Sequence, residues 1–219
     1  MRTDEEIQKD IVAQLRWEPA LSASAIEVSV KKGIVRLGGE VDSYFKKVTA
    51  ENAARMISGV RAIADDIQIG VKPSDDKTDA DIAEVVATAL AFNRYVEAKK
   101  IRVTVDKGIV TLEGSASWNF ERKAAAEIIK GLKGVRGINN YIVVKPDVPP
   151  TDVKKSIEEM LARHATVDPE NISVVVEGGK VILWGTVRSL AEGDDVEYAA
   201  WSAPGVEAVD NRLKLEETE

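Results

Sequence analysis

The residues that could do chemistry in this chain are few, and they form no recognisable catalytic set. Its 219 residues include one histidine, His164, and no cysteine. This argues against a Ser-His-Asp or Cys-His site and leaves a typical zinc site short of ligands. We expect His164 to be an exposed polar residue at the end of a helix. The sequence thus predicts no catalytic residue, cofactor or metal, and a protein that is not an enzyme.

Acidic residues gather in two runs that need an explanation. The run SDDKTDAD at 74–81 lacks the glycine and final glutamate of an EF-hand, which favours a linker followed by a helix cap. The run EGDDVE at 192–197 opens a predicted helix, where the helix dipole favours acids. A weak cation site in this acidic last third is the alternative.

Aromatic residues beside basic ones form a more specific candidate site. SYFKK at 43–47 and WNFERK at 118–123 each form a predicted loop that enters a helix. Rings at headgroup depth with cations near phosphate suit an anionic membrane surface. A staple that fixes the helix entry, with solvated charges, is the alternative. The candidate residues for contact with lipid or a partner are Tyr44, Phe45, Lys46, Lys47, Trp118, Phe120, Arg122 and Lys123.

Three copies of one unit carry these residues. Three glycines recur in each copy with spacings of 6 and 20 residues, and the copies are offset by 75 and 71 residues. We predict that the first glycine takes a positive φ in a two-residue turn, that the second lets a helix approach a strand, and that the third caps a helix. No Gly-Lys-Ser/Thr follows, so phosphate cradling is disfavoured. The nine structural glycines are Gly33, Gly39, Gly59, Gly108, Gly114, Gly134, Gly179, Gly185 and Gly205.

Each copy predicts the same order of elements. Apolar residues at i, i+4 and i+8, such as Ile7, Ile11 and Leu15, indicate a first helix, with Thr3 or Thr78 as its cap. Two alternating strands, a second helix and a last strand follow. We therefore predict an α+β protein of three tandem α-β-β-α-β domains at 1–72, 78–145 and 150–217. In each, two helices pack on one face of a small three-stranded mixed sheet.

Comparison of the three copies distinguishes core positions, which are apolar in every copy, from positions where one copy alone has an aromatic residue. Trp184 stands where the other copies have Gly38 and Glu113, and Trp17 aligns with Phe92 and Arg163, which predicts that Trp17 is half buried. Exposed apolar patches mark contacts. The candidate patch packs against another copy in the chain, or against an external partner or a second chain. Its residues are Val175, Ile182, Trp184 and Trp201.

Charge and hydropathy narrow the classes of partner. The net charge is −7, and residues 148–219 alone carry 15 acidic and 7 basic residues. That distribution argues against nucleic acid, which needs a basic face. No apolar run approaches the length of a membrane span, and residues 1–15 lack a secretory signal pattern. We expect a cytoplasmic location, or a periplasmic one if a signal has been removed.

The repeated unit resembles the bacterial OsmY and nodulation domain, the BON family. The resemblance rests on IEVSVKKGIVRLGGEV with GVRAIADDIQI, and on IRVTVDKGIVTLEGSA with GVRGINNYIVV and ISVVVEGGKVILWGTV with GVEAVDNRLKL. It implies a non-enzymatic protein of osmotic and envelope stress that binds phospholipid surfaces, envelope components or ions. We expect contact with anionic phospholipid or membrane-associated proteins. The alternatives are a protein-interaction scaffold or chaperone-like protein that uses the apolar sheet face of the third domain, alone or as a homo-oligomer, and weak cation binding.

Overall fold

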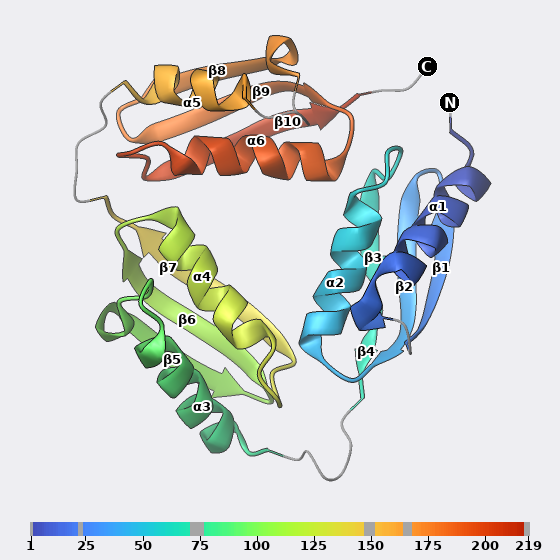
Figure 1. The fold of residues 1–219 in the computed structure, drawn as a ribbon, viewed down its shortest axis with the longest axis vertical. Helices are drawn as coiled ribbons and strands as arrows, with labels where there is room; N and C mark the ends of the chain where they lie inside the picture. Colours follow the sequence, from blue (N-terminus) through green and yellow to red (C-terminus); the bar gives the residue numbers. More distant parts are fainter. Residues whose placement is uncertain (1, 22–23, 71–76, 147–151, 164–167, 217–219) are drawn as a thin grey trace. The chain divides into compact units, whose positions relative to one another are not determined.

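Three small sheets follow one another along the chain, and two helices cover one face of each (Figure 1). The computed structural model describes residues 2–21, 24–70, 77–146, 152–163 and 168–216. Domain 1 runs from α1 to β4, domain 2 from α3 to β7, and domain 3 from α5 to β10. The predicted α+β class and the three tandem α-β-β-α-β units are confirmed.

The elements recur in the same order in each domain. Domain 1 contains α1 (Asp4–Trp17), β1 (Ala25–Lys31), β2 (Ile34–Val41), α2 (Tyr44–Arg55), β3 (Ala62–Asp65) and β4 (Gln68–Ile69). Domain 2 contains α3 (Asp79–Phe92), β5 (Ile101–Asp106), β6 (Ile109–Ala116), α4 (Asn119–Lys130) and β7 (Gly137–Val144). Domain 3 contains α5 (Val153–Leu161), β8 (Ile172–Glu177), β9 (Lys180–Val187), α6 (Leu190–Ser202) and β10 (Ala208–Leu215). A short 3₁₀ helix precedes each first strand: η1 (Pro19–Leu21), η3 (Ala98–Lys100) and η4 (Pro169–Asn171).

Each sheet is mixed, with the second strand of the domain in the middle. The first and second strands form an antiparallel hairpin, and the last strand pairs parallel to the second. Domain 1 departs from its sisters because its last strand is divided into β3 and β4, whereas β7 and β10 are continuous. The last strand therefore lies at an edge of the sheet in every domain.

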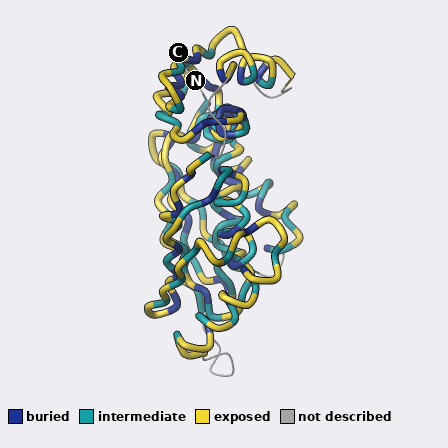
Figure 2. Tube along the Cα trace, turned by 90° about the vertical axis from the view of Figure 1, so that its left-hand side faces the viewer, coloured by how far each residue is buried: buried dark blue, intermediate teal, exposed yellow. Residues whose placement is uncertain are grey.

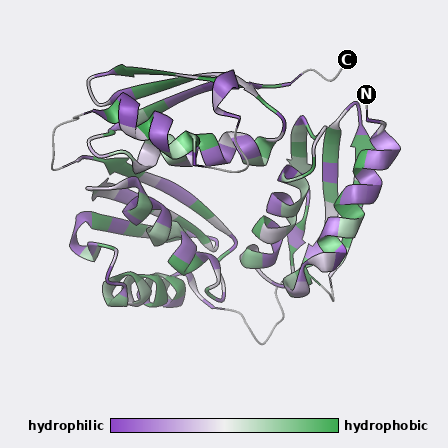
Figure 3. Cartoon of the chain, turned by 45° about the horizontal axis from the view of Figure 1, so that its top comes forward, coloured by the Kyte–Doolittle hydropathy of each residue, from purple (hydrophilic) through white to green (hydrophobic). Residues whose placement is uncertain are grey.

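The core of each domain lies between its helices and its sheet. Ile7, Ile11 and Leu15 are buried along α1, and Val35, Leu37 and Val41 alternate with more exposed residues along β2. Buried positions recur in this way along the helices and strands (Figure 2). Hydrophilic and hydrophobic bands alternate correspondingly on the helices (Figure 3). The opposite face of each sheet carries no helix of its own domain (Figure 1).

A carboxylate at the first residue of the first helix fixes that helix to the hairpin turn in domains 1 and 2. Asp4 accepts hydrogen bonds from the backbone N–H groups of Lys32 (2.7 Å) and Gly33 (3.0 Å). These bonds hold the pKa of Asp4 below its usual value. Asp79 accepts from the two turn residues of domain 2 in the same way, at 2.8 and 2.9 Å. The first helix therefore begins at the hairpin and ends at the opposite end of the domain.

The first glycine of each copy lies in the expected two-residue turn, but with one difference. Gly33 and Gly108 have φ of 72° and 77°. The preceding lysine of those turns is left-handed too, with φ of 53° at Lys32 and 51° at Lys107. In domain 3 only the first turn residue, Gly178, has a left-handed φ, of 61°, so the prediction for Gly179 is wrong. Because both turn residues are glycine there, either can take that conformation. Gly179 instead leaves room for a side chain, since a Cβ would lie 2.8 Å from Cγ of Glu207.

The second glycine leaves room for backbone rather than for a helix, so that expectation was wrong. Gly39, Gly114 and Gly185 have φ of 101°, 138° and 134°. A Cβ at these positions would lie 2.1, 1.9 and 1.9 Å from a carbonyl oxygen at or just before the start of the first strand. These oxygens belong to Ala25, Lys100 and Asn171.

The third glycine was predicted to cap the second helix, and this prediction is wrong. It lies three or four residues beyond the helix end. Gly59, Gly134 and Gly205 have φ of 91°, 92° and 85° there. At Gly59 and Gly134, a Cβ would lie 2.9 and 2.8 Å from Cδ1 of an isoleucine of the first helix. The glycine thus lets the turn pack against that helix.

In every domain an Asp or Asn of the last strand makes two contacts, one with a backbone N–H just beyond it and one with the second helix. We call these two contacts together the Asx bridge. The side-chain Oδ1 accepts from the backbone N–H two residues further along, at 3.1 to 3.2 Å. The acceptors are Asp65, Asn140 and Asn211, and the donors are Ile67, Ile142 and Leu213. The backbone N–H groups on the outer side of an edge strand can pair with other chains. The Asx bridge occupies one of these N–H groups with a side chain of the same domain.

The partner on the helix side of the Asx bridge differs between domains. In domain 1, Asp65 lies 3.3 Å from Nζ of Lys47. In domain 2, Nδ2 of Asn140 donates to the carbonyl oxygen of Arg122 at 2.7 Å. In domain 3, Nδ2 of Asn211 donates to a carboxylate oxygen of Glu197 at 3.1 Å. The Asx residue is thus shared, while its helical partner is a cation, a carbonyl group or a carboxylate.

We predict that Asn140→Ala destabilises domain 2 by about 1–2 kcal/mol, because two partly buried hydrogen bonds are lost. The amide of Ile142 should then exchange with solvent deuterons faster. Denaturant unfolding and residue-resolved hydrogen exchange measure the two effects. Asn139→Ala is the matched control, since Asn139 is an exposed neighbour in the same strand. Equal effects of the two substitutions would contradict a role for the Asx bridge.

Candidate functional site

In domains 1 and 2 the first helix ends, and the second begins, at the same end of the domain, which we call the tip. The first helix begins at the hairpin, and α1 and α3 have 14 residues each, so they end about 20 Å away. The middle strand also runs from the hairpin to the tip, where it leads into the second helix. The tip therefore collects residues from two separate stretches of the sequence, the end of the first helix and the junction of the middle strand with the second helix.

The predicted loops at 43–47 and 118–123 are largely helical, which corrects that expectation. Tyr44, Phe45, Lys46 and Lys47 form the first turn of α2. Trp118 precedes α4, which contains Phe120, Arg122 and Lys123. The helix of domain 2 starts this early because the carboxylate of Glu121 accepts from the N–H groups of Ser117 (2.9 Å) and Trp118 (3.2 Å). The side chains of each set therefore point to several sides of a helix.

Exposed aromatic rings mark both tips. Phe45 and Phe120 are 42% and 48% exposed in the first turn of the second helix. Trp17 and Phe92, the last residues of α1 and α3, are 82% and 85% exposed. The prediction that Trp17 is half buried is wrong, because Trp17 lies about 200° around the helix from the buried Leu15. Each tip thus presents one aromatic ring from each helix.

Domain 2 adds two tip residues that the sequence reasoning missed. The ring of Tyr95 meets that of Phe120 edge-on, with centroids 6.3 Å apart and planes at 79°. The guanidinium of Arg94 lies 5.6 Å from the centroid of Tyr95. Tyr95 is itself exposed. The signal in the sequence was the pair Arg94-Tyr95, an aromatic residue beside a cation just after the first helix.

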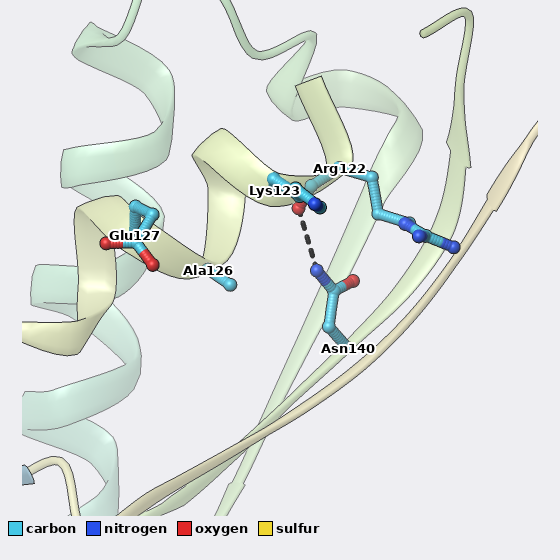
Figure 4. A pocket seen from close by; sticks show the side chains of 5 residues that line it. All are labelled: Arg122, Lys123, Ala126, Glu127 and Asn140. Carbon is cyan, nitrogen blue, oxygen red and sulfur yellow. Dashed lines mark hydrogen bonds between the residues drawn. The ribbon is translucent and has the colours of Figure 1, made fainter. Parts of the chain in front are cut away.

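The cations named from the sequence do not share one role. Lys47 turns to its own sheet, where Nζ donates to the carbonyl oxygen of Ile67 at 2.7 Å and pairs with Asp65. Arg122 and Lys123 instead line a shallow hollow between α4 and β7 (Figure 4). Lys123 lies three residues after Phe120, on the same side of the helix. In domain 2 a cation and an exposed ring are therefore neighbours.

A buried polar group at the tip of domain 2 breaks the usual rule of hydrogen-bond pairing. Asn119, the first residue of α4, is buried, and within the described residues its Oδ1 has no hydrogen-bond partner. Such a group costs about 1–3 kcal/mol. The sister domains have Tyr44 and Leu190 at this position. The tip of domain 2 thus retains a polar residue at a cost in stability.

Domain 3 lacks the aromatic tip. Arg163 and Ala191 stand where domain 1 has Trp17 and Phe45. Its second helix begins instead at a buried carboxylate, Glu192, which accepts from the backbone N–H of Arg188 at 2.7 Å and from its guanidinium at 3.1 and 3.2 Å. Ser189 caps the helix by accepting from the N–H of Glu192. The acidic run at 192–197 therefore has a structural use in α6.

The apolar patch predicted in domain 3 is divided between two places. Val175, Ile182 and Trp184 share the open face of the sheet, where Ile182 is buried by its neighbours and the other two are exposed. Trp201 does not belong to the patch, because it lies in α6 on the opposite side of the sheet and is 8% exposed. Its Nε1 lies 3.3 Å from a carboxylate oxygen of Glu197.

Charged residues cover part of Trp184. The guanidinium of Arg212 lies 4.7 Å from the centre of the indole ring. Asp210 binds Arg212 at 2.8 Å and Lys180 at 3.2 Å, which lowers the pKa of Asp210. Trp184 nevertheless stays 43% exposed. The open face of domain 2 carries exposed apolar residues too, which the sequence reasoning missed: Ile109, Tyr141 and Val143.

Within the described ranges, no group of three or more His, Cys, Asp or Glu side chains could hold a metal ion. His164 and residues 74–76 of the acidic run at 74–81 lie outside the described residues, whereas Thr78 of that run caps α3 as predicted. No described helix is long and apolar enough to cross a membrane.

We predict that Glu192→Gln lowers the stability of domain 3 at pH 7 by about 1–2 kcal/mol, because charged hydrogen bonds to Arg188 are lost. Burial raises the pKa of Glu192, but its bonds with Arg188 outweigh burial and leave that pKa below the usual value. The stabilisation is therefore fully present above the usual pKa of a glutamate and is lost as the pH falls below that value through the lowered pKa of the folded state. Thermal unfolding of both proteins from pH 3 to 7 measures this. A difference independent of pH would contradict it.

Comparison with known proteins identifies the repeated unit. The sequence model of the BON domain family matches residues 3–71, 78–146 and 151–217. Osmotically-inducible protein Y of Escherichia coli (strain K12) is 29% identical over 145 residues, which are 62% of this chain and 72% of that protein. An uncharacterized protein in the gshII 5′ region of Anaplasma centrale is 27% identical over 125 residues, or 56% of this chain and 83% of that protein.

Solved structures add little to this comparison. Two structures of CdsD, a structural protein of the type III secretion system of Chlamydia trachomatis, are 17% identical to this chain. They cover 96% and 98% of it, and 92% and 100% of their own chains, with TM-scores of 0.28 and 0.27. A likeness this low carries no argument about function.

Proposed function

This chain belongs to the BON domain family, and on that premise we propose that it is a non-enzymatic binding protein of osmotic stress that contacts anionic phospholipid surfaces. Membrane-associated proteins at such a surface are further partners. The observation that carries this proposal is the pair of exposed aromatic tips on domains 1 and 2. We propose the domain boundaries 1–72, 78–145 and 150–217. The cytoplasmic location stays a prediction from the sequence.

The tips have the chemistry that an anionic membrane interface favours. Trp17 and Phe92 project from helix ends, where almost no protein surface covers them. Aromatic rings settle at headgroup depth, and burial of apolar area contributes about 25 cal/mol per Å². Cations near such a surface contribute about 1 kcal/mol each. Phe120 with Lys123 and Tyr95 with Arg94 combine both features.

The distribution of charge supports a division of roles between the domains. Residues 148–219 carry 15 acidic and 7 basic residues and have no aromatic tip. An anionic surface repels such a domain. Domains 1 and 2 are therefore the lipid-contacting parts in this proposal, and two weak contacts on one chain combine through effective concentration.

We predict that Phe45→Ala with Phe120→Ala weakens co-flotation with phosphatidylglycerol vesicles at least about tenfold, which corresponds to a loss of about 1.4 kcal/mol. Alanine is the residue that domain 3 has at this position, so the fold tolerates it. Binding of the unaltered protein should weaken with added salt and be absent on phosphatidylcholine vesicles.

Tyr141→Ala is the matched control for this experiment, because Tyr141 is an exposed aromatic residue on the open sheet face of domain 2. It should leave flotation unchanged. Equal flotation of the double variant and the unaltered protein would reject the tips as the contact surface. No flotation on any vesicle would reject the lipid proposal itself.

A second candidate function is protein binding through the open sheet face of domain 3. The exposed Trp184 beside Arg212 favours it, because tryptophan and arginine are enriched at the centres of protein interfaces. The occupant in this proposal is a protein partner or a second copy of the chain. The first proposal ranks above it because two domains share the aromatic tip.

We predict that, under this second proposal, Trp184→Glu abolishes self-association or protection of a client protein and leaves the fold intact. A carboxylate in the middle of an apolar contact must be desolvated, which opposes binding. Sedimentation velocity and circular dichroism measure the two properties. Tyr141→Glu, on the corresponding face of domain 2, is the control. Association that persists in Trp184→Glu would exclude this face as its cause.

A further inference from the structure

The first strand of domain 2, β5, lies at the edge of its sheet opposite to the edge that carries the Asx bridge. In an antiparallel hairpin, successive residues turn their N–H and C=O groups alternately toward the partner strand and away from it. Asp106 and Ile109 flank the two-residue turn and pair with each other, so the backbone groups of Val103 and Val105 face outward. These two valines therefore present backbone donors and acceptors along the outer side of β5.

Domain 1 has the same edge in a covered form. Nε2 of Gln8 in α1 donates to the carbonyl oxygen of Val28 at 2.7 Å, and Val28 has the place in its hairpin that Val103 has in domain 2. Ala83 stands in α3 where α1 has Gln8, and a methyl group cannot donate a hydrogen bond. Domain 2 thus leaves out the side chain that covers this edge in domain 1.

The exposed side chains of β5 are ordered so that the strand complements an antiparallel copy of itself. Arg102, Thr104 and Asp106 are exposed and alternate with the two valines. If two β5 strands lie antiparallel with Thr104 opposite Thr104, Arg102 of each copy faces Asp106 of the other, and opposite charges in such a pair are stabilising. In the same register Val103 lies opposite Val105. The register that pairs the charges is therefore also the one that pairs the outward backbone groups.

The order of charges also selects against the other first strands. In domain 1 an acid, Glu27, and a base, Lys31, stand in the reverse order. An antiparallel pair of β1 with β5 would place Glu27 opposite Asp106 and two bases opposite each other, which is destabilising. Two β8 strands would form no ion pair in this register, because a serine replaces Arg102 there. Of the three first strands, β5 alone combines this charge order with an edge that no glutamine covers.

We propose that a second copy of this chain docks on β5, so that two β5 strands pair antiparallel about a two-fold axis at Thr104. The N–H and C=O groups of Val103 bond those of Val105 in the second copy, and Arg102 forms an ion pair with Asp106 of the second copy. The two sheets of domain 2 then form one continuous sheet. Because each copy contributes one strand, the interface is small and the dimer is weak and concentration-dependent. This contact needs neither a membrane nor the open face of domain 3.

The test is sedimentation velocity of the full chain at increasing concentration, where the unaltered protein should form dimers. Ala83→Gln should cover the edge as Gln8 does in domain 1, and Asp106→Arg should place an arginine opposite Arg102. Each should raise the dimer dissociation constant at least about tenfold. The charge exchange, Asp106→Arg with Arg102→Asp, restores opposite charges and should recover the dimer. Trp184→Glu should leave it unchanged, which separates it from association through domain 3.

A cysteine at the two-fold axis gives a site-specific measurement, because the chain has no cysteine of its own. Thr104→Cys should form a disulfide-linked dimer under mild oxidation, since directly opposite residues of an antiparallel pair lie within reach of a disulfide. Ser29→Cys is the matched control, because Ser29 is exposed at the same place in β1, where Gln8 covers the edge. It should crosslink more slowly, and Ala83→Gln should slow the crosslinking of Thr104→Cys to that rate.

Three results would overturn the inference: an unaltered protein that stays monomeric at every concentration, a dimer that neither Ala83→Gln nor Asp106→Arg weakens, or equal crosslinking of the two cysteine variants. Loss of the dimer in Asp106→Arg without recovery in the charge exchange would contradict the register. Circular dichroism of each variant verifies that the fold is intact.

Discussion

The tips depend on one interaction, the carboxylate of Asp4 or Asp79 that accepts two hydrogen bonds from the hairpin turn. It sets where the first helix begins, and helix length then sets where its last residue lies. Because the middle strand also starts at the hairpin, the second helix begins beside the end of the first. Trp17 and Phe45, which are 28 residues apart in the sequence, are thereby brought to one end of domain 1. The aromatic tip is a consequence of this anchored fold.

The Asx bridge shows how one fold is altered at one position without loss of the fold. The strand side of the bridge is constant, an Asp or Asn that accepts from a backbone N–H. The helix side differs between the domains, because a lysine, a carbonyl oxygen or a glutamate can each pair with the Asp or Asn side chain. Only in domain 2 is a main-chain group sufficient.

Much of the fold could be predicted from the sequence, because it depends on periodic and repeated features. Ile7, Ile11 and Leu15 at helical spacing are buried as a set, and the capping residues Thr3 and Thr78 accept from the third residue of their helices. Three copies made each such pattern more secure than one would. The reasons for the second and third glycines could not be predicted, because they depend on a carbonyl oxygen and a side chain distant in the sequence.

The candidate site was predictable only in part, for a physical reason. Sequence patterns reveal which residues are aromatic or basic, but direction depends on where a helix starts. A start at Tyr44 rather than after Lys47 turned Lys47 toward its own sheet, and the register of α1 turned Trp17 to solvent. Trp201 was assigned to the patch of domain 3 because the other copies have basic residues at its position. It is instead a buried residue of α6, the helix that covers the inner face of the sheet.

The three domains share one fold but differ in the surfaces that they expose. Three identical domains would only multiply one contact, whereas here two domains keep exposed rings and the third has an acidic composition and an open sheet face with Trp184. The rule that buried polar groups are paired is broken at Asn119, beside Phe120, and such exceptions are typical of functional positions. Domain 2 combines this exception with an aromatic tip in α4 and its neighbours.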